Sequence, residues 1–279
     1  MSQYRIQDLL DIMARLRDPE QGCPWDRQQT NASLVPFTLE EAYEVADAIE
    51  AGDDMHFCDE LGDLLFQIVF YARIAEEEQR FRFDDVVQAI CEKLIRRHPH
   101  VFGDENIESA EAQNKAWEEH KKKERASKLT DTNGNSGEQP SELDGVSHAL
   151  PALVRAQKLQ RRAARVGFDW DTVEGVWQKF EEELQEIREA GNDARAIEDE
   201  IGDLLFTAVN LARFLNVDAE TALRKANHKF SRRFRRVEDL VREGGGDMQA
   251  MSVAELDRVW NAAKSEEETA STRGPAACC

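Results

Sequence analysis

Carboxylates at helical spacing are the residues of this chain whose types and positions could do chemistry. Two nearly identical stretches, Asp59–Phe66 (DELGDLLF) and Asp199–Phe206 (DEIGDLLF), agree at seven of their eight positions. Each holds a Glu and an Asp three residues apart: Glu60 with Asp63, and Glu200 with Asp203. Such a pair shares one helical face, and apolar residues follow it directly. A carboxylate in an apolar stripe is costly unless a cation, such as a metal ion, compensates it.

A second acidic motif, EExxE, precedes each pair. In the second copy, Glu183 and Glu186 lie on one expected helix and Glu200 and Asp203 on the next, with a turn at 191–193 between them. If these helices pack antiparallel, the four carboxylates face one another at matching heights. Four like charges require divalent cations, and an all-oxygen ligand set suits Mg²⁺, with Mn²⁺ as an alternative. The first copy holds the same four acids, at Glu41, Glu44, Glu60 and Asp63.

A structural interpretation of these acids stays open beside the chemical one. In a chain with 33% charged residues, an EExxE alone is most often a solvated helix face. The pairing across a turn, the apolar run and the repetition favour a metal site, but a duplicated packing unit would also preserve them. Ferritin-like di-iron proteins need ExxH motifs, which do not follow either EExxE, and Asp-rich diphosphate-binding runs are not found.

Composition limits the partners. The 36 Lys and Arg against 56 Asp and Glu give 279 residues a net charge of −20, which disfavours nucleic acid and anionic membranes. A phosphate-bearing ligand would therefore need a local cationic site or a metal. Five scattered cysteines without CxxC spacing predict reduced thiols in a cytoplasmic protein, and no stretch resembles a signal peptide or a membrane span.

Helical periodicity without strand-like alternation predicts an all-α fold. We expect helices at 5–17, 39–50, from the first signature to about 78, 84–97, 109–124, 151–165, 172–190, 194–215, 219–242 and 253–264. A loop is expected at 18–26, and residues 126–147 have the composition of a flexible linker. The expected divisions are an N-terminal domain (1–125), the linker (126–147), a C-terminal domain (148–265) and a disordered tail (266–279).

The two halves repeat more than the signature, which indicates duplication of a unit of about 120 residues. The further matches are Trp25-Asp26 with Trp170-Asp171, Lys93 and Arg97 with Lys229 and Arg233, and Trp117 and Lys121 with Trp260 and Lys264.

At these residues the chain resembles the MazG family of nucleoside triphosphate pyrophosphohydrolases. The resemblance rests on EExxE followed by ExxD, the GDLLF run, Asn227-x-Lys229-Phe230 with Arg233, and the stretch Arg97–Phe102 (RHPHVF). It implies two tandem MazG-like helical-bundle units built around antiparallel helix hairpins. It also implies a homodimer and Mg²⁺-dependent cleavage of NTPs, and of dNTPs, between the α and β phosphates to NMP and diphosphate, for cleaning or control of nucleotide pools.

The resemblance also implies roles for single residues of the C-terminal unit. Glu183, Glu186, Glu200 and Asp203 are the expected metal ligands, and Lys179, Glu182, Lys229, Arg233, Trp260 and Lys264 the expected nucleotide contacts. The expected catalytic set is Glu182, Glu183, Glu186, Lys229 and Arg233, with Glu182 as a base that orients water. A solvated Glu182, a core Trp260 and a solvated run of arginines are the alternative interpretations.

Two features predict that the C-terminal copy is the catalytic one. Lys179 stands four residues before Glu183, where the first copy has Phe37. Pro36 and Thr38 also suggest a helix start, so that Thr38-x-x-Glu41 would be a capping box and give Glu41 a structural role. Whether the N-terminal site is also active stays open.

A function of another class competes with the enzyme. In it the chain is a helical interaction module, the acidic sites are structural, and the linker and basic helix recruit a regulatory protein partner. The products of incubation with NTPs and Mg²⁺ discriminate between the two functions.

Overall fold

The fold comes from a computed structural model that describes residues 4–103, 109 and 141–272. The chain divides into two compact units, Met1–Gly134 and Asn135–Cys279, and their boundary falls within the stretch expected to be a linker. Every regular element in the described residues is helical, as predicted. In this part of the chain, no helix is long and apolar enough to cross a lipid bilayer.

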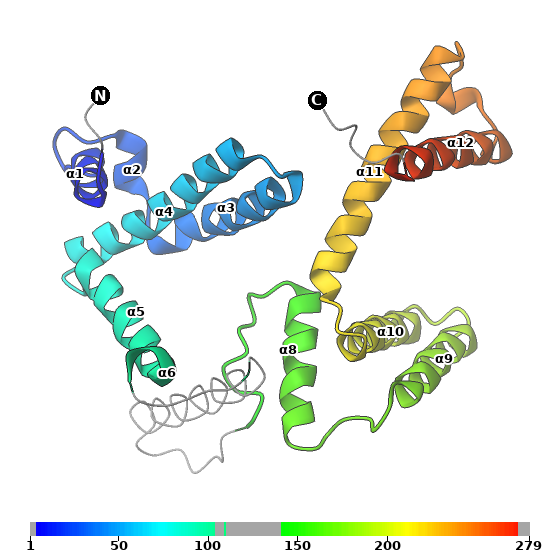
Figure 1. The fold of residues 1–279 in the computed structure, drawn as a ribbon, viewed down its shortest axis with the longest axis horizontal. Helices are drawn as coiled ribbons and strands as arrows, with labels where there is room; N and C mark the ends of the chain where they lie inside the picture. Colours follow the sequence, from blue (N-terminus) through cyan, green and yellow to red (C-terminus); the bar gives the residue numbers. More distant parts are fainter. Residues whose placement is uncertain (1–3, 104–108, 110–140, 273–279) are drawn as a thin grey trace. The chain divides into compact units, whose positions relative to one another are not determined.

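Unit 1 is organised around a helix hairpin (Figure 1). Its elements are α1 (Ile6–Leu16), α2 (Pro24–Gln28), α3 (Asn31–Ala51), α4 (Asp54–Glu77), α5 (Phe83–Arg97) and α6 (Pro99–Phe102). Helices α3 and α4 pack on each other, and α1 packs on α4. Gly52 takes the left-handed conformation between α3 and α4, and the Asp53 carboxylate caps α4 by accepting from the backbone N–H groups of Met55 and His56. The core consists of Met13, Leu34, Val69, Phe70 and Ile74.

The predicted start of the third helix near Thr38 was wrong. Helix α3 begins at Asn31, and Thr30 forms the capping box with Ser33. Pro36 lies inside the helix, and the Thr38 hydroxyl lies 3.1 Å from the Leu34 carbonyl and 2.8 Å from the Tyr71 hydroxyl. Thr38 is therefore not a cap, and the structural role expected for Glu41 is lost.

The loop expected at 18–26 contains a short helix. Pro24 opens α2, a position where its fixed φ and missing N–H cost nothing. Arg17 ties α2 to the hairpin, because its guanidinium donates to the Asp26 carbonyl at 2.5 Å and lies 2.7 Å from a Glu77 carboxylate oxygen.

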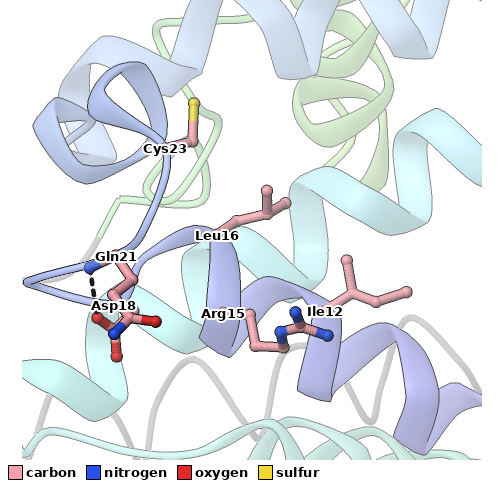
Figure 2. Close-up of a pocket in the computed structure, with 6 residues that line it drawn as sticks. All are labelled: Ile12, Arg15, Leu16, Asp18, Gln21 and Cys23. Atoms are coloured by element: carbon pink, nitrogen blue, oxygen red, sulfur yellow. Dashed lines mark hydrogen bonds between the residues drawn. The ribbon is translucent and has the colours of Figure 1, made fainter.

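The turn between α1 and α2 borders a cavity of about 370 Å³ (Figure 2). Asp18 accepts hydrogen bonds from the backbone N–H groups of Gln21 and Glu20, which hold its pKa below the ordinary value. A Cβ on Gly22 would lie 2.4 Å from the Leu16 carbonyl oxygen, so only glycine fits there. The Asp18 carboxylate, which lines this cavity, therefore stabilises the turn between α1 and α2.

Helix α5 ends at Arg97, as predicted, and the following HPHVF stretch adds the short helix α6. The His98 Nδ1 lies 2.6 Å from the Leu94 carbonyl oxygen, which is a local helix-end contact. The expected helix at 109–124, with Trp117 and Lys121, lies outside the described residues except for Ser109.

Unit 2 contains a second hairpin of the same kind (Figure 1). Its elements are α8 (Ala152–Arg165), α9 (Val173–Glu189), α10 (Ala194–Phe214), α11 (Ala219–Glu243), the 3₁₀ turn η1 (Met248–Ala250) and α12 (Val253–Thr272). Helices α9 and α10 form the hairpin, α8 packs on α10, and α12 packs on α11. Two buried glutamines on α8 anchor it: Gln157 donates to the Val217 carbonyl at 3.0 Å, and Gln160 to the Phe206 carbonyl at 2.7 Å.

The bounds of α8 to α11 agree with the expected ranges within one residue, but α12 does not end at Lys264. It continues to Thr272, because Glu266 and Glu267 pair with arginines of α11. The prediction of a disordered tail from 266 was therefore wrong for 266–272, and 273–279 lie outside the described residues.

The expected linker also ends earlier than 147. Residues 142–145 form a turn, Val146 is buried, and Arg162 of α8 donates to the Asp144 carbonyl. This part of the stretch is therefore fixed to α8, whereas 126–140 lie outside the described residues.

Candidate metal and nucleotide site

The α9–α10 hairpin gathers three of the four acids expected to bind metal. Glu183, Glu200 and Asp203 each offer a carboxylate oxygen, and these oxygens lie within 4.8 Å of one another. Gly191, with a positive φ, turns the chain between the helices, and Asp193 caps α10 through the N–H groups of Arg195 and Ala196. The turn residues thus fix the register that brings the acids to the same height.

Lys179 neutralises part of this charge. Its Nζ lies 2.8 Å from the Glu183 Oε1 and 2.9 Å from the Glu182 Oε1, on the same face of α9. Hydrogen bonds to Glu183 and Glu182 raise the pKa of Lys179 above its ordinary value. The site therefore contains a permanent cation beside its most buried acid.

The Glu183 side chain fits a divalent cation. The residue is 2% exposed, and its second oxygen, Oε2, is buried without a hydrogen-bond partner among the described residues. A buried, unsatisfied carboxylate oxygen is costly, and a metal ion would satisfy it. The all-oxygen donor set of Glu183, Glu200 and Asp203 is the kind that Mg²⁺ accepts.

Glu186, the fourth expected ligand, lies beside this group but outside the three converging oxygens. Burial raises its pKa, Lys179 opposes that rise, and the charges of Glu200 and Glu183 add to it. The charges of the acidic group therefore affect the pKa of Glu186, although its carboxylate is not one of the three that converge.

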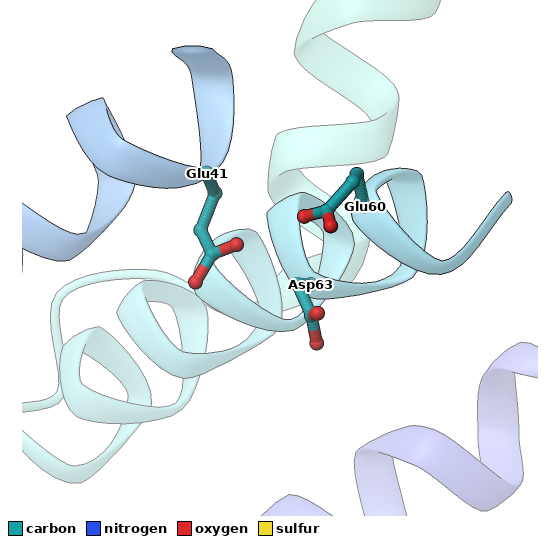
Figure 3. A group of neighbouring side chains, drawn as sticks. All are labelled: Glu41, Glu60 and Asp63. Atoms are coloured by element: carbon teal, nitrogen blue, oxygen red, sulfur yellow. The ribbon is translucent and has the colours of Figure 1, made fainter. Parts of the chain in front are cut away.

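The first hairpin repeats the arrangement, but its buried acid is Glu60, whose Oε1 lies 3.1 Å from the His56 Nδ1. Glu41, Glu60 and Asp63 offer carboxylate oxygens that lie within 4.8 Å of one another (Figure 3). Glu44 does not belong to this group. Burial, followed by the charges of Asp63, Glu44 and Glu60, raises the pKa of Glu41. Phe37, in the place of Lys179, contacts Trp25 edge-on at 5.8 Å between ring centroids. The lysine is thus one difference between the copies, whereas the capping role expected for Glu41 is not.

The remaining expected nucleotide contacts lie on the α11–α12 hairpin. Arg233 pairs with Glu267, and the Lys264 Nζ lies 3.9 Å from a Glu268 oxygen. Trp260 contacts Phe230 at 5.4 Å between ring centroids and packs on the buried cluster of Val237, Val241 and Ala263. Lys229 is on α11 one turn before Arg233. These contacts include none of the three converging acids, and those of Trp260 agree with its alternative interpretation as a core aromatic.

One feature at the start of α9 was missed in the sequence. Trp170 packs on Gly175 of α9 so closely that a Cβ there would lie 2.3 Å from the Trp170 Cδ1. A glycine inside an otherwise regular amphipathic helix, five residues after a Trp, was the available signal.

Together the fold and site define an all-α protein built from two acidic helix hairpins, one of which carries a lysine beside a buried glutamate. The profile of the MazG nucleotide pyrophosphohydrolase domain matches residues 29–102 and 171–237. The chain therefore belongs to the MazG family, as its motifs predicted.

Similar proteins span almost the same length. An Escherichia coli K12 protein named nucleoside triphosphate pyrophosphohydrolase is 50% identical over 267 residues, covering 94% of this chain and 98% of that protein. A Thermotoga maritima protein named nucleoside triphosphate pyrophosphohydrolase/pyrophosphatase MazG is 46% identical, covering 95% and 97%. The crystal structure of a mazG-related protein from Thermotoga maritima is 32% identical, covers 42% of this chain and 98% of its own, and has a TM-score of 0.36.

Proposed function

We propose that the C-terminal unit hydrolyses nucleoside triphosphates, and deoxynucleoside triphosphates, between the α and β phosphates to NMP and diphosphate, in a reaction that depends on Mg²⁺. Membership of the MazG family makes the chain a hydrolase of phosphoric anhydrides. The observation that carries the assignment to this unit is the buried, unsatisfied oxygen of Glu183, which lies in a residue paired with Lys179 and grouped with Glu200 and Asp203.

The residues of this site have different roles in the proposed reaction. Glu183, Glu200 and Asp203, with Glu186 beside them, would hold Mg²⁺, with Mn²⁺ as a substitute. The ion supplies Lewis acidity and neutralises phosphate charge when bound. Lys179 places a fixed positive charge where the triphosphate arrives, in a chain whose net charge of −20 otherwise repels it.

Proton transfer is assigned to Glu182, which is exposed on the same face of α9 and is held by Lys179 at 2.9 Å. From there its carboxylate would orient the attacking water and accept the proton. In this proposal Lys229 and Arg233 supply further cations for the phosphates, and Trp260 and Lys264 contact the nucleotide, as the family resemblance implies.

Self-association is part of the proposal. Unit 1 exposes an apolar groove of about 780 Å³ on α4 and α5, lined among others by Leu65, Ile68, Phe81, Val87 and Ile90. Gly62 and Gly202, one in each signature, also have open space where a Cβ would be. Large exposed apolar faces mark interaction sites, so we propose a homodimer that covers them.

We place the protein in the cytoplasm, where it would clean or control nucleotide pools.

The test is a product analysis with a panel of NTPs and dNTPs and Mg²⁺. NMP and diphosphate are expected; NDP and phosphate would indicate a different reaction, and no turnover would favour an interaction module with a regulatory protein partner. Glu186→Ala and Asp203→Ala should abolish diphosphate release, whereas the matched variants Glu44→Ala and Asp63→Ala in unit 1 should spare most of it. Equal losses in both units would contradict the assignment to the C-terminal unit.

A further inference from the structure

We propose that Trp170 is the platform for the nucleobase of the substrate and that Gly175 provides its seat. The proposal rests on the proposed function, because it takes the acids of α9 and α10 as the phosphate end of the site. It adds a contact for the base at the opposite end of α9.

The indole of Trp170 approaches Gly175 of α9 with its Cδ1 edge. A Cβ at Gly175 would lie 2.3 Å from its Cδ1 and 3.2 Å from its Nε1, so no side chain fits between ring and helix. Trp170 nevertheless remains 42% exposed. The Cδ1 edge of the five-membered ring is therefore held against the helix, while a substantial part of the ring is open to a ligand.

The loop that carries Trp170 is anchored to the second helix of the hairpin. Arg213 of α10 forms two hydrogen bonds to the Asp169 carboxylate, one of 3.0 Å from Nη1 to Oδ2, and its Nε donates to the buried Asn210 at 2.8 Å. The backbone N–H of Trp170 in turn donates to the Asp169 Oδ1 at 3.0 Å. A ring held in this way loses little freedom when a base stacks on it.

The position of Gly175 puts the Trp170 ring over the same face of α9 as Lys179 and Glu182. Steps of three and four residues put Gly175, Lys179, Glu182 and Glu186 on one face of α9. Glu183 is eight residues from Gly175, or about 12 Å along the helix. A nucleotide can follow this face, with its phosphates at the carboxylates and Lys179, its base on Trp170 and its ribose between them. Stacking on an aromatic side chain accepts any base.

The first unit lacks this seat. Ser33 stands where unit 2 has Gly175, and it is engaged in the capping box with Thr30. Trp25, the counterpart of Trp170, contacts Phe37, which replaces Lys179. Trp25 thus has the same Trp-Asp motif as Trp170 but does not pack on a glycine of the described chain, and it can serve as a matched control.

The experiment measures NTP hydrolysis by the full-length protein, with inorganic tripolyphosphate as a competitor that has no base. Trp170→Ala should raise KM for the NTP about tenfold while the Ki of tripolyphosphate stays within about twofold of the wild-type value. Gly175→Ala, whose methyl group displaces the indole, should act in the same way. Trp170→Phe, which keeps an aromatic face, should retain most of the affinity, and Trp25→Ala should leave both constants unchanged.

Three results would overturn the platform: an unchanged KM in Trp170→Ala, a parallel rise of KM and Ki, or a selective rise of KM in Trp260→Ala alone. If Trp170→Ala does not fold, the comparison of Gly175→Ala with Trp170→Phe decides. A wild-type protein that hydrolyses no NTP would contradict the proposed function itself, which separates the two failures.

Discussion

The Nζ of Lys179 lies 2.8 Å from one oxygen of Glu183, while the other oxygen of that carboxylate is buried without a partner in the described part of the chain. The ion pair thus satisfies half of the carboxylate and leaves the second oxygen for a ligand. Phe37 cannot do this for Glu41, so the two hairpins present the same acids with different charge compensation.

Removal of the lysine should therefore damage both binding and folding. In Lys179→Met we expect kcat/KM for the NTP to fall at least about tenfold, because a cation at the phosphates and beside Glu183 is lost. The free energy of unfolding without metal should fall by about 1–2 kcal/mol, since Lys179 is partly exposed. Steady-state kinetics and urea unfolding in EDTA measure the two effects. Phe37→Met, the matched change in unit 1, should leave kcat/KM unchanged.

Mg²⁺ alone should stabilise the protein through Glu183. At an ion concentration tenfold above the dissociation constant, the free energy of unfolding should rise by about 1.4 kcal/mol. Glu183→Gln should lose most of that gain, whereas Glu189→Gln, at an exposed position on the same helix, should keep it. Calorimetric scans with Mg²⁺ and with EDTA provide the measurement, and equal gains in the two variants would exclude Glu183 as a ligand.

Acid should weaken the contact between α1 and α4. Burial would raise the pKa of Glu77, but hydrogen bonds from Arg17 and Arg73 outweigh it and hold that pKa below its ordinary value of 4.5. Because the folded-state pKa is lowered, the contribution to stability is present above pH 4.5 and is lost as the pH falls through the lowered pKa.

At pH 7, Glu77→Gln should accordingly destabilise the protein by about 1–2 kcal/mol. The difference from wild type should shrink as the pH falls below 4.5. Urea unfolding across this range tests the prediction. Glu78→Gln serves as the control, because Glu78 pairs only with the exposed Arg80 in the contacts described for it and should change little. A pH-independent difference would contradict the role given to the Glu77 charge.

The last turns of α12 should depend on ion pairs. Glu266 pairs with Arg236, and Glu267 with Arg232 and Arg233. In the double variant Glu266→Gln/Glu267→Gln, the amides after Lys264 should exchange with solvent about tenfold faster, because the anchoring charges are gone. Hydrogen exchange read by mass spectrometry shows the effect, and Glu268→Gln is the neighbouring control. Unchanged protection in the double variant would mean that helix propensity alone holds this end.

The helices of unit 2 and the pairing of acids across each hairpin were predictable, because both depend on local signals. Gly191 and Asp193 are residues typical of a turn. The helical spacing on either side of that turn then determines which acids face one another. The same reasoning failed at α3, where Pro36 looked like a boundary. The Thr30–Ser33 capping box and the burial of Leu34 outweighed the cost of one proline inside the helix.

Contacts between residues far apart in the sequence could not be predicted from the sequence. The extension of α12 depends on arginines 30 to 35 residues earlier. The packing of Trp170 on Gly175 depends on a loop conformation that Arg213 fixes from another helix. Spacing also placed Glu44 and Glu186 among the ligands, but one turn along each helix shifts their oxygens out of the converging three.

Gly62 and Gly202 have a consequence for engineering. Each lies inside a helix, and no atom of the described chain outside its own helical surroundings lies within 4 Å of the place where a Cβ would be. A helix-interior glycine costs about 1 kcal/mol relative to alanine. A chain with alanine at both positions should therefore resist heat better than the natural one while every contact within each unit is retained. If a second subunit packs closely there, the same methyl groups would weaken assembly, so heat resistance and quaternary structure would respond in opposite directions.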